Sequence, residues 1–287
     1  MKRSAARIKA QAAAMGVFDT IVVADERALA EEELKPWRHI LQPHVRGFGY
    51  WCWKPYLIEK TLRTLNPGDI LLYCDAGTHL NPEGLPRFRE YLHLLDESPL
   101  GVLAFDACQH EQAPYLERQW NKGDTLRYFG CESRPDIADS PQVAATQIFL
   151  RYCPQALTFV KDWNAAWQHD FHLIDDSPSQ TENATDFCQH RHDQSLFSLL
   201  YKLRGGVLLP WWEKYARDWD SLRAYPLWTM RDKGHRIRPL LRLFLYLLGG
   251  WCPIPSVRKR YSDLAAAYLK RRPYLREYLS IRKGKKR

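Results

Sequence analysis

The sequence predicts an α/β fold, with a mainly parallel sheet covered by helices on both faces. Short and nearly continuous apolar segments alternate along the chain with longer amphipathic segments, which is the pattern of strands buried between helices. The 287 residues are 45% hydrophobic and 26% charged, and 13% of them are aromatic. Such a chain is too apolar to be disordered, and it is long enough for one large domain or two small ones.

The predicted elements follow one another in a regular order. The first are a helix over Ser4–Met15 and a buried strand over Thr20–Ala24. A helix over Pro55–Leu65 begins with proline, which suits a first helical turn. The other predicted strands are Asp69–Cys74, Gly101–Phe105, Ala145–Tyr152 and Gly206–Leu209. The other predicted helices are Gly84–Leu95, Pro154–His169 and Asp193–Leu203.

The strand that ends at Cys74 is followed by Asp75-Ala-Gly77. Ligands of α/β sheets bind at the carboxyl ends of strands. A carboxylate followed by small residues lets the chain approach a diphosphate or its metal ion closely. The alternative is a plain corner in which Asp75 caps the next element.

The segment Arg46–Pro55, with sequence RGFGYWCWKP, is a second candidate for ligand binding. Its two glycines predict a bendable loop, and its aromatic rings, Trp53 among them, offer faces for a base or sugar. Lys54 comes just before the predicted helix N-terminus, which suits a nucleotide diphosphate. The alternative is an aromatic core turn with Lys54 exposed.

A third polar region combines Asp175-Asp176 with the run His190–Ser195. A helix that begins near Asp193 would present Asp193 and Gln194 to a ligand, the first as a base and the second as both donor and acceptor. Helix capping by Asp193 is the structural alternative. Zinc at His190 and His192 would need a third ligand in a recognisable pattern, which is lacking. Weaker candidates are Lys122, Asp124, Gln142, Gln147 and His235.

Charge divides the chain into an acidic body, residues 1–230, and a basic tail, residues 231–287. The tail holds 17 of the 42 Lys and Arg residues and three acids, a net charge of +14, whereas the body has 25 bases and 30 acids. Leu243–Pro255 carries no charge but is too short to span a bilayer, and amphipathic segments follow it. We expect the tail to be helical and to attach to an anionic membrane surface.

The seven cysteines stand singly, so neither a zinc ribbon nor a disulfide scaffold is indicated and a reducing compartment fits. The first fifteen residues lack the apolar segment of a secretion signal. We therefore expect a cytoplasmic protein, peripheral on the inner face of the cytoplasmic membrane. Nucleic acid is not an expected partner, because the positive charge lies in the tail rather than around the candidate site.

Taken together, these segments resemble bacterial glycosyltransferases of the GT-A fold that build capsule, O-antigen and lipopolysaccharide. The resemblance covers about Ser4 to Arg204, and its segments also include Arg7-Ile8, Gln11-Ala12, Phe18-Asp19, Trp120-Asn-Lys122, Thr146-Gln147 and His190–Leu200. It implies a GT-A catalytic domain in residues 1–230. The implied reaction transfers a sugar from a nucleotide sugar, most commonly a UDP-sugar, to an oligosaccharide or lipid-linked acceptor.

The resemblance also implies roles for individual residues. The catalytic candidates are Asp193, Gln194 and Asp176, and Asp193-Gln194 is similar to the Asp-Gln element of glycogenin-like transferases. The donor-binding candidates are Arg46, Trp53, Lys54, Asp75, Gly77 and Lys122, and those for the sugar or acceptor are Gln147, Asp175 and His192. Tyr73–Gly77 looks like the Asp-x-Asp element that holds Mn²⁺ or Mg²⁺, but Gly77 replaces the second Asp. Metal dependence is therefore in doubt unless His235 or another group completes the site with Asp75.

Two other classes of function remain open. A metal-dependent nucleotidyltransferase or hydrolase would need Asp75, Asp106 and Asp193 to converge on one metal ion. A non-enzymatic adaptor would depend on the basic tail alone. The sequence does not distinguish an inverting from a retaining transferase, nor does it identify the sugar.

Overall fold

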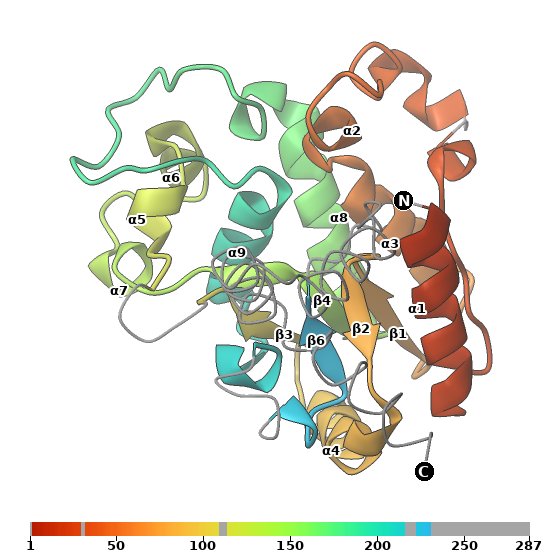
Figure 1. Cartoon of the computed structure of the whole chain (residues 1–287). Coiled ribbons are helices and arrows are strands. Elements are labelled where there is room, and N and C mark those ends of the chain that lie inside the picture. Colours follow the sequence, from red (N-terminus) through yellow and green to blue (C-terminus); the bar gives the residue numbers. More distant parts are fainter. Residues whose placement is uncertain (1, 30–31, 109–113, 216–221, 231–287) are drawn as a thin grey trace, which may run out of the picture.

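A mixed sheet of four strands lies at the centre of the protein, in the order β1-β4-β3-β5 (Figure 1). The computed structural model describes residues 2–29, 32–108, 114–215 and 222–230. The strands of this sheet are β1 (Ile70–Cys74), β3 (Val102–Asp106), β4 (Val143–Arg151) and β5 (Val207–Leu209). The basic tail, and with it His235, lies outside the described residues, so the predicted tail helices stay a prediction.

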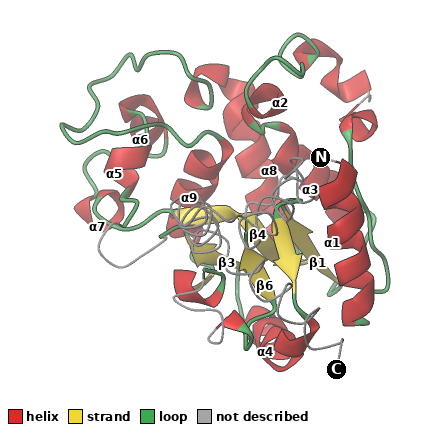
Figure 2. Cartoon of the chain, viewed as in Figure 1, coloured by secondary structure: helices red, strands yellow, loops and turns green. Residues whose placement is uncertain are grey.

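Helices cover both faces of this sheet, as the sequence predicts (Figure 2). The longer helices are α1 (Lys2–Met15), α3 (Trp53–Leu62), α4 (Leu85–Asp96), α8 (Pro154–His169) and α9 (Asp193–Arg204). The short ones are α2 (Gly47–Tyr50), α5 (Glu117–Trp120), α6 (Gly123–Tyr128) and α7 (Pro135–Ala138). Short 3₁₀ helices cover Glu26–Leu29, Glu32–Trp37, Pro82–Gly84, Phe171–Leu173 and Trp211–Glu213.

Two apolar cores, one on each face, explain why these helices pack where they do. Along β4, Ile148 faces the core formed with α3, α8 and α9, whereas its neighbour Phe149 faces the core formed with α1 and α4. Successive side chains of a strand point to opposite faces, so one strand supplies both cores. In the first core the indole ring of Trp163 on α8 is almost fully buried. Burial of such a ring contributes about 2–3 kcal/mol of hydrophobic stabilisation.

The predicted mainly parallel sheet is wrong, because β4 runs antiparallel to both β1 and β3. Among the described strands, β3 and β5 alone form a parallel pair. The described residues between β3 and β4 form the short helices α5, α6 and α7, which lie together to one side of α9 in Figure 1. A parallel crossover needs a segment that crosses the face of the sheet. Since none of these three helices does so, β4 starts at the edge where β3 ends.

The predicted strand Thr20–Ala24 is also wrong. These residues belong to no strand; Val22 is 71% exposed, and Ile21 packs against the core beside α1 and α4. β-Branched residues fit a pleated surface, but a strand also requires a partner, which local composition does not specify. The sequence also misses a two-stranded antiparallel sheet, formed by β2 (Thr78–Leu80) and β6 (Leu227–Thr229).

Candidate active site

Asp75 lies directly after β1, at the edge of the sheet where β1 and β3 end and β4 begins. Its N–H donates to the Thr146 carbonyl at 2.9 Å, and its own carbonyl accepts from the Thr78 N–H at 2.9 Å. The Tyr73 hydroxyl donates to Asp75 Oδ1 at 2.7 Å. Burial, followed by the charge of Asp75, raises the pKa of Tyr73 and keeps this phenol protonated. The Asp75 side chain is still 35% exposed, so a positioned carboxylate remains open to a ligand.

Helix α1 holds the same turn from another side. The Arg7 guanidinium donates to the carbonyl of Ala76 at 2.8 Å and to that of Thr78 at 2.7 Å. Gln11, one helical turn further on, accepts from Arg7 at 2.9 Å. Neither Arg7 nor Gln11 is among the candidate site residues that the sequence predicts. The available signal is their spacing of four residues, which places both on one face of a helix.

Lys54 is the buried centre of the candidate site. It lies in the first turn of α3 rather than before it, and only 3% of its surface is exposed, so the alternative of an exposed lysine is wrong. Its Nζ lies 2.5 Å from Asp193 Oδ2 and 3.7 Å from Asp75 Oδ1, and it donates to the Ala145 carbonyl at 2.9 Å. Burial opposes the charged ammonium, but the two carboxylates outweigh burial and raise the pKa of Lys54. With all three groups ionised, this cluster carries a net charge of −1.

Asp193 is the first residue of α9, and its side chain points to Lys54 rather than capping the helix. The helix cap is His192, whose side chain makes no capping hydrogen bond. Burial raises the pKa of Asp193 to about 6, although Lys54 favours its charged form. Such a group changes charge close to neutral pH, which suits proton transfer.

Gln194 and Asp193 diverge, although the sequence treats them as one element. Gln194 Nε2 donates to Gln142 Oε1 at 2.9 Å, and Gln142 in turn donates to the Trp120 carbonyl at 3.3 Å. Gln194 is only half-buried. The structure therefore places Asp193 beside Asp75 and directs Gln194 toward the chain around α5.

Gln147 has a structural position within the site. It is buried opposite Cys74 in the β1–β4 ladder, and its Nε2 donates to Thr78 Oγ1 at 2.8 Å and to Thr229 Oγ1 at 3.0 Å. The side chain thus joins the large sheet to both strands of the small one. Gly77 lies in the turn between β1 and β2. At this position the chain reverses direction next to the Asp75 carboxylate.

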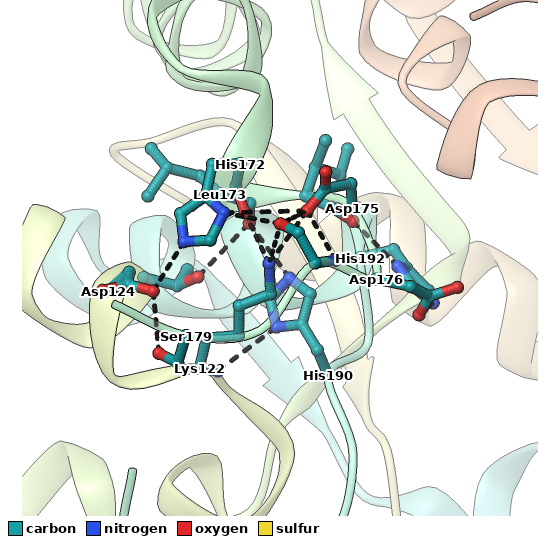
Figure 3. Close-up of polar contacts among 12 residues, drawn as sticks. Lys122, Asp124, His172, Leu173, Asp175, Asp176, Ser179, His190 and His192 are labelled. Atoms are coloured by element: carbon teal, nitrogen blue, oxygen red, sulfur yellow. Dashed lines mark hydrogen bonds and ion pairs between the residues drawn. The ribbon is translucent and has the colours of Figure 1, made fainter. Parts of the chain in front are cut away.

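The predicted donor residue Lys122 belongs to a separate cluster (Figure 3). It is 3% exposed, contacts Asp175 Oδ1 at 3.0 Å and donates to the His172 carbonyl at 2.7 Å. The His172 ring pairs with Asp124 at 2.7 Å. This cluster joins α6 to the segment that follows α8, so Lys122 and Asp175 organise a loop.

His190 and His192 are both buried, and both rings bond to backbone carbonyls (Figure 3). His190 Nε2–H donates to the Leu173 carbonyl at 3.0 Å, and His192 Nδ1–H donates to the Ile174 carbonyl at 2.8 Å. Burial lowers the pKa of each imidazole, so both are neutral near pH 7. Two rings tied down in this way do not form the zinc pair considered from the sequence.

Asp176 and Arg46 form an accessible pair beside His192. Arg46 Nη1 lies 3.1 Å from Asp176 Oδ1, and both side chains are 44% exposed. His192 Nε2 lies 3.6 Å from the same oxygen. When the Gln189 amide is oriented so that its oxygen faces Arg46, this oxygen accepts hydrogen bonds from Nη2 at 2.9 Å and from Nη1 at 3.1 Å. Asp176 thus has different partners from its neighbour Asp175, which bonds to Lys122.

The glycine-rich segment before α3 is a left-handed turn. All five residues of Gly47–Trp51 have positive φ, and those of Phe48, Tyr50 and Trp51 are 56°, 52° and 61°. For residues other than glycine this conformation costs about 1–2 kcal/mol each. The Trp51 ring lies where a Cβ on Gly47 would stand, and Trp53 Nε1 donates to the Gly47 carbonyl at 3.0 Å. The predicted bendable loop is therefore a packed turn, in which Trp53 supports the backbone.

The structure does not bring the three carboxylates of the hydrolase alternative together on one metal ion. Asp106 accepts from the Cys108 N–H at 3.1 Å, and burial raises its pKa. Across the described ranges, no group of three or more His, Cys, Asp and Glu side chains is arranged to hold a metal. The tentative ligand His235 lies beyond residue 230 and so outside those ranges.

Comparison with known proteins finds no matching family model, no similar curated protein and no similar solved structure. Within the described part of the chain, no helix combines the length and apolar character needed to cross a bilayer.

Proposed function

We propose that this chain is a glycosyltransferase of the GT-A type that transfers a sugar from a nucleotide sugar, with a UDP-sugar as the expected donor, to a bacterial surface glycan. One observation carries the proposal: Asp75 and Asp193, more than one hundred residues apart, meet on the buried ammonium of Lys54. The sequence resemblance independently singles out the same carboxylates. Asp75 directly follows the carboxyl end of β1, and α/β sheets bind ligands at the carboxyl ends of their strands.

Asp75 is the group best placed to hold the donor diphosphate through a divalent cation. The cluster of Lys54, Asp75 and Asp193 has a net charge of −1, which attracts a cation rather than a bare diphosphate. Tyr73 and Lys54 both contact Asp75 Oδ1, and among the described residues no hydrogen bond reaches Oδ2. Mg²⁺ is commonly bound by one or two carboxylates together with substrate phosphates, so one open carboxylate fits. A bound cation would offset the charge of the departing nucleotide diphosphate.

Lys54 positions the two carboxylates instead of contacting the diphosphate itself. Its Nζ is fully enclosed and already has three oxygen partners. Of the predicted donor-binding cations, Arg46 alone has a half-exposed side chain near the site. Its guanidinium is suited to phosphate or sugar oxygens.

Asp193 is the candidate base for the acceptor hydroxyl in an inverting reaction. The acceptor oxygen would attack the anomeric carbon as the bond to the diphosphate breaks, and its proton would pass to the Asp193 carboxylate. A pKa of about 6 places this carboxylate in the useful range at neutral pH. In a retaining reaction the leaving phosphate would take the proton, and Asp193 would orient the sugar.

The proposed location is the inner surface of the cytoplasmic membrane, where a lipid-linked or oligosaccharide acceptor would be extended. The support is the net charge of +14 in residues 231–287. Each basic residue near an anionic surface contributes about 1 kcal/mol, and salt screens this attraction. Flotation with anionic liposomes should recover the full chain at low salt, and should recover much less of a chain ending at Met230. Equal recovery of both chains, or of neither, would exclude the tail as an anchor.

A donor screen tests the proposed activity. Purified protein is combined with UDP-, GDP-, CMP- and dTDP-sugars, with and without Mn²⁺, and its melting temperature and release of free nucleotide are measured. One nucleotide class should raise the melting temperature and be turned over slowly without acceptor, more strongly with the metal. A chain that neither binds nor consumes any of these donors would overturn the proposal.

A further inference from the structure

We propose that His192, Asp176 and Arg46 form a subsite for the vicinal hydroxyl groups of a pyranose ring. This inference rests on the proposed function in one respect, because it assigns the subsite to a sugar substrate of that reaction. The subsite lies at the start of α9, directly before the residue that pairs with Lys54.

The first support is an unsatisfied nitrogen. His192 Nδ1–H donates to the Ile174 carbonyl at 2.8 Å, so Nε2 of the neutral ring is a hydrogen-bond acceptor. The side chain is 3% exposed, and no described residue donates a hydrogen bond to Nε2. Buried polar atoms nearly always have partners, and the exceptions call for a functional explanation. A hydroxyl group from a ligand would supply the missing donor.

The backbone of His192 provides the second support. Its φ of 56° and ψ of −125° match the first central position of a type II′ turn, which glycine normally occupies. A histidine held there requires the surrounding structure to compensate for the strain, and such strain is concentrated at functional sites. The Tyr50 and Trp51 rings pack against the imidazole, with centroids 5.1 and 5.6 Å away. Both aromatic residues belong to the left-handed turn, so two strained segments hold one ring in place.

The neighbouring pair completes a set of groups that matches a diol. Asp176 Oδ1 lies 3.6 Å from His192 Nε2, so two acceptors face each other with no proton between them. Two adjacent hydroxyl groups would donate one proton to each acceptor, and Arg46 would donate back to a hydroxyl oxygen. Asp176 and Arg46 are both 44% exposed, so a ligand in solution can reach this pair. Carboxylate and guanidinium side chains both satisfy hydroxyl groups through directional hydrogen bonds.

A direct readout is the ¹⁵N resonance of His192 Nε2 in the full chain labelled at histidine. The signal is assigned by its loss in His192→Gln. We expect an unprotonated, unbonded Nε2 in the protein alone, unchanged by UDP and shifted by hydrogen bonding when a sugar binds. A shift with UDP-sugars but not with UDP assigns the subsite to the donor sugar. A shift with methyl glycopyranosides in UDP-saturated protein assigns it to the acceptor.

Two results would overturn this inference. One is a doubly protonated His192 in the protein alone, since the ring would then form a structural ion pair with Asp176. The other is an Nε2 resonance that no UDP-sugar and no methyl glycopyranoside shifts at saturating concentration. The measurement is repeated in Asp75→Asn, in which transfer is expected to be lost. In this variant the shift should persist, because Asp75 is not part of the subsite. A wild-type chain whose Nε2 resonance shifts with glycoside but that consumes no nucleotide sugar would overturn the proposed function and leave the subsite intact.

A kinetic test uses a matched pair of variants. Asp176→Asn removes one acceptor and should raise KM for the sugar substrate about 10-fold or more, which is the scale for one charged hydrogen bond. Affinity for UDP should not change. The control is Asp136→Asn, because Asp136 is also exposed and pairs with an arginine, Arg134, at 2.6 Å. If Asp176→Asn behaved like the control, the subsite would not include Asp176.

Discussion

Two lysines in this protein are buried to the same extent, yet their surroundings affect the partner carboxylates in opposite ways. Lys54 and Lys122 are each 3% exposed. Burial raises the pKa of Asp193 beside Lys54. At Asp175, beside Lys122, burial acts in the same direction, but hydrogen bonds from Ser177 and Lys122 outweigh it and lower the pKa.

The difference separates a site that is ready for a ligand from one that stabilises a loop. Around Lys122 the charged groups are well satisfied: Asp124 accepts from Ser179, Gln180 and Thr181 as well as pairing with a histidine. Around Lys54 two carboxylates share one cation, and Asp75 stays open to solvent. A buried ion pair is therefore a poor sign of function by itself. An unbalanced cluster at the edge of a sheet is a better one.

The largest effect on stability should come from Lys54→Met. Removing this ammonium leaves Asp193 buried without its cation, and loss of one partner of a buried pair costs about 3–5 kcal/mol. Urea unfolding of the variant should show this loss, whereas Lys161→Met on the exposed face of α8 should behave like the wild type. A loss under about 1 kcal/mol would mean that Lys54 does not hold the cluster together.

The pH dependence of stability should reveal Asp193. Its pKa of about 6 lies above the value near 3.9 of an exposed Asp, so the folded state retains a proton that the unfolded chain releases. The stabilising contribution of this carboxyl group is thus present below pH about 4 and is lost as the pH rises through about 6. Across this range the contribution of Asp193 to the free energy of unfolding changes by about 3 kcal/mol.

This contribution is isolated by urea unfolding of wild type and Asp193→Asn across this pH range, because the other acids cancel in the difference. The stability of the wild type relative to the variant should fall between pH about 4 and 6 and then level off. If Asp193 is the base, kcat/KM should rise over the same interval. A stability difference that does not change with pH would contradict the raised pKa.

Asp193 pairs with Lys54 and Asp175 pairs with Lys122, and the Asp→Asn variants of the two should differ in stability and turnover at pH 7.5. In Asp175→Asn the free energy of unfolding should fall by about 1–3 kcal/mol, because the variant loses a carboxylate that accepts hydrogen bonds from Lys122 and Ser177. Asp193→Asn should lose less stability, because its amide avoids the cost of burying an ionised group. Turnover should show the reverse order, with Asp193→Asn slow at unchanged UDP affinity. Collapse of UDP affinity in Asp193→Asn would instead place this residue at the donor phosphates.

A smaller effect is expected for Arg7, which positions Asp75 from a distance. Arg7→Met removes both hydrogen bonds to the turn carbonyls and should lower kcat about tenfold, the scale of one or two net hydrogen bonds. Arg7→Lys should recover part of this loss. Lys9→Met, an exposed change on the same helix, is the control. If Arg7→Met altered only the melting temperature, α1 would have no positioning role.

Most elements of this fold could be predicted from sequence, because each long helix and strand carries its own periodic apolar pattern. The bounds predicted for α8 agree with the structure, and those for β1, β3 and β5 agree within one residue. Strand direction could not be predicted, since strands buried on both faces look alike whether parallel or antiparallel. The strand expected at Thr20–Ala24 failed for a related reason, as its residues lack a partner strand.

The sequence predicted which residues belong to the candidate site, but not which of them contact one another. Asp75, Lys54 and Asp193 were all chosen from local motifs, and the structure adds that they form one cluster. The same motifs also selected Lys122, Asp175, Gln147 and Trp53, whose polar groups support the backbone or join elements. A polar side chain near a motif looks the same in sequence whether its partners come from a ligand or from the fold. Only the full set of hydrogen bonds separates the two cases.

The account depends most directly on Asp75, and the decisive measurement is release of nucleotide from the donor found in the screen. Wild type, Asp75→Asn and the exposed control Asp96→Asn are compared with Mn²⁺ present. We expect equal rates for wild type and control. For Asp75→Asn we expect a rate that is reduced by about 10²-fold or more, with an unchanged unfolding midpoint. A folded Asp75→Asn protein that released nucleotide at the wild-type rate would contradict the assignment of this site.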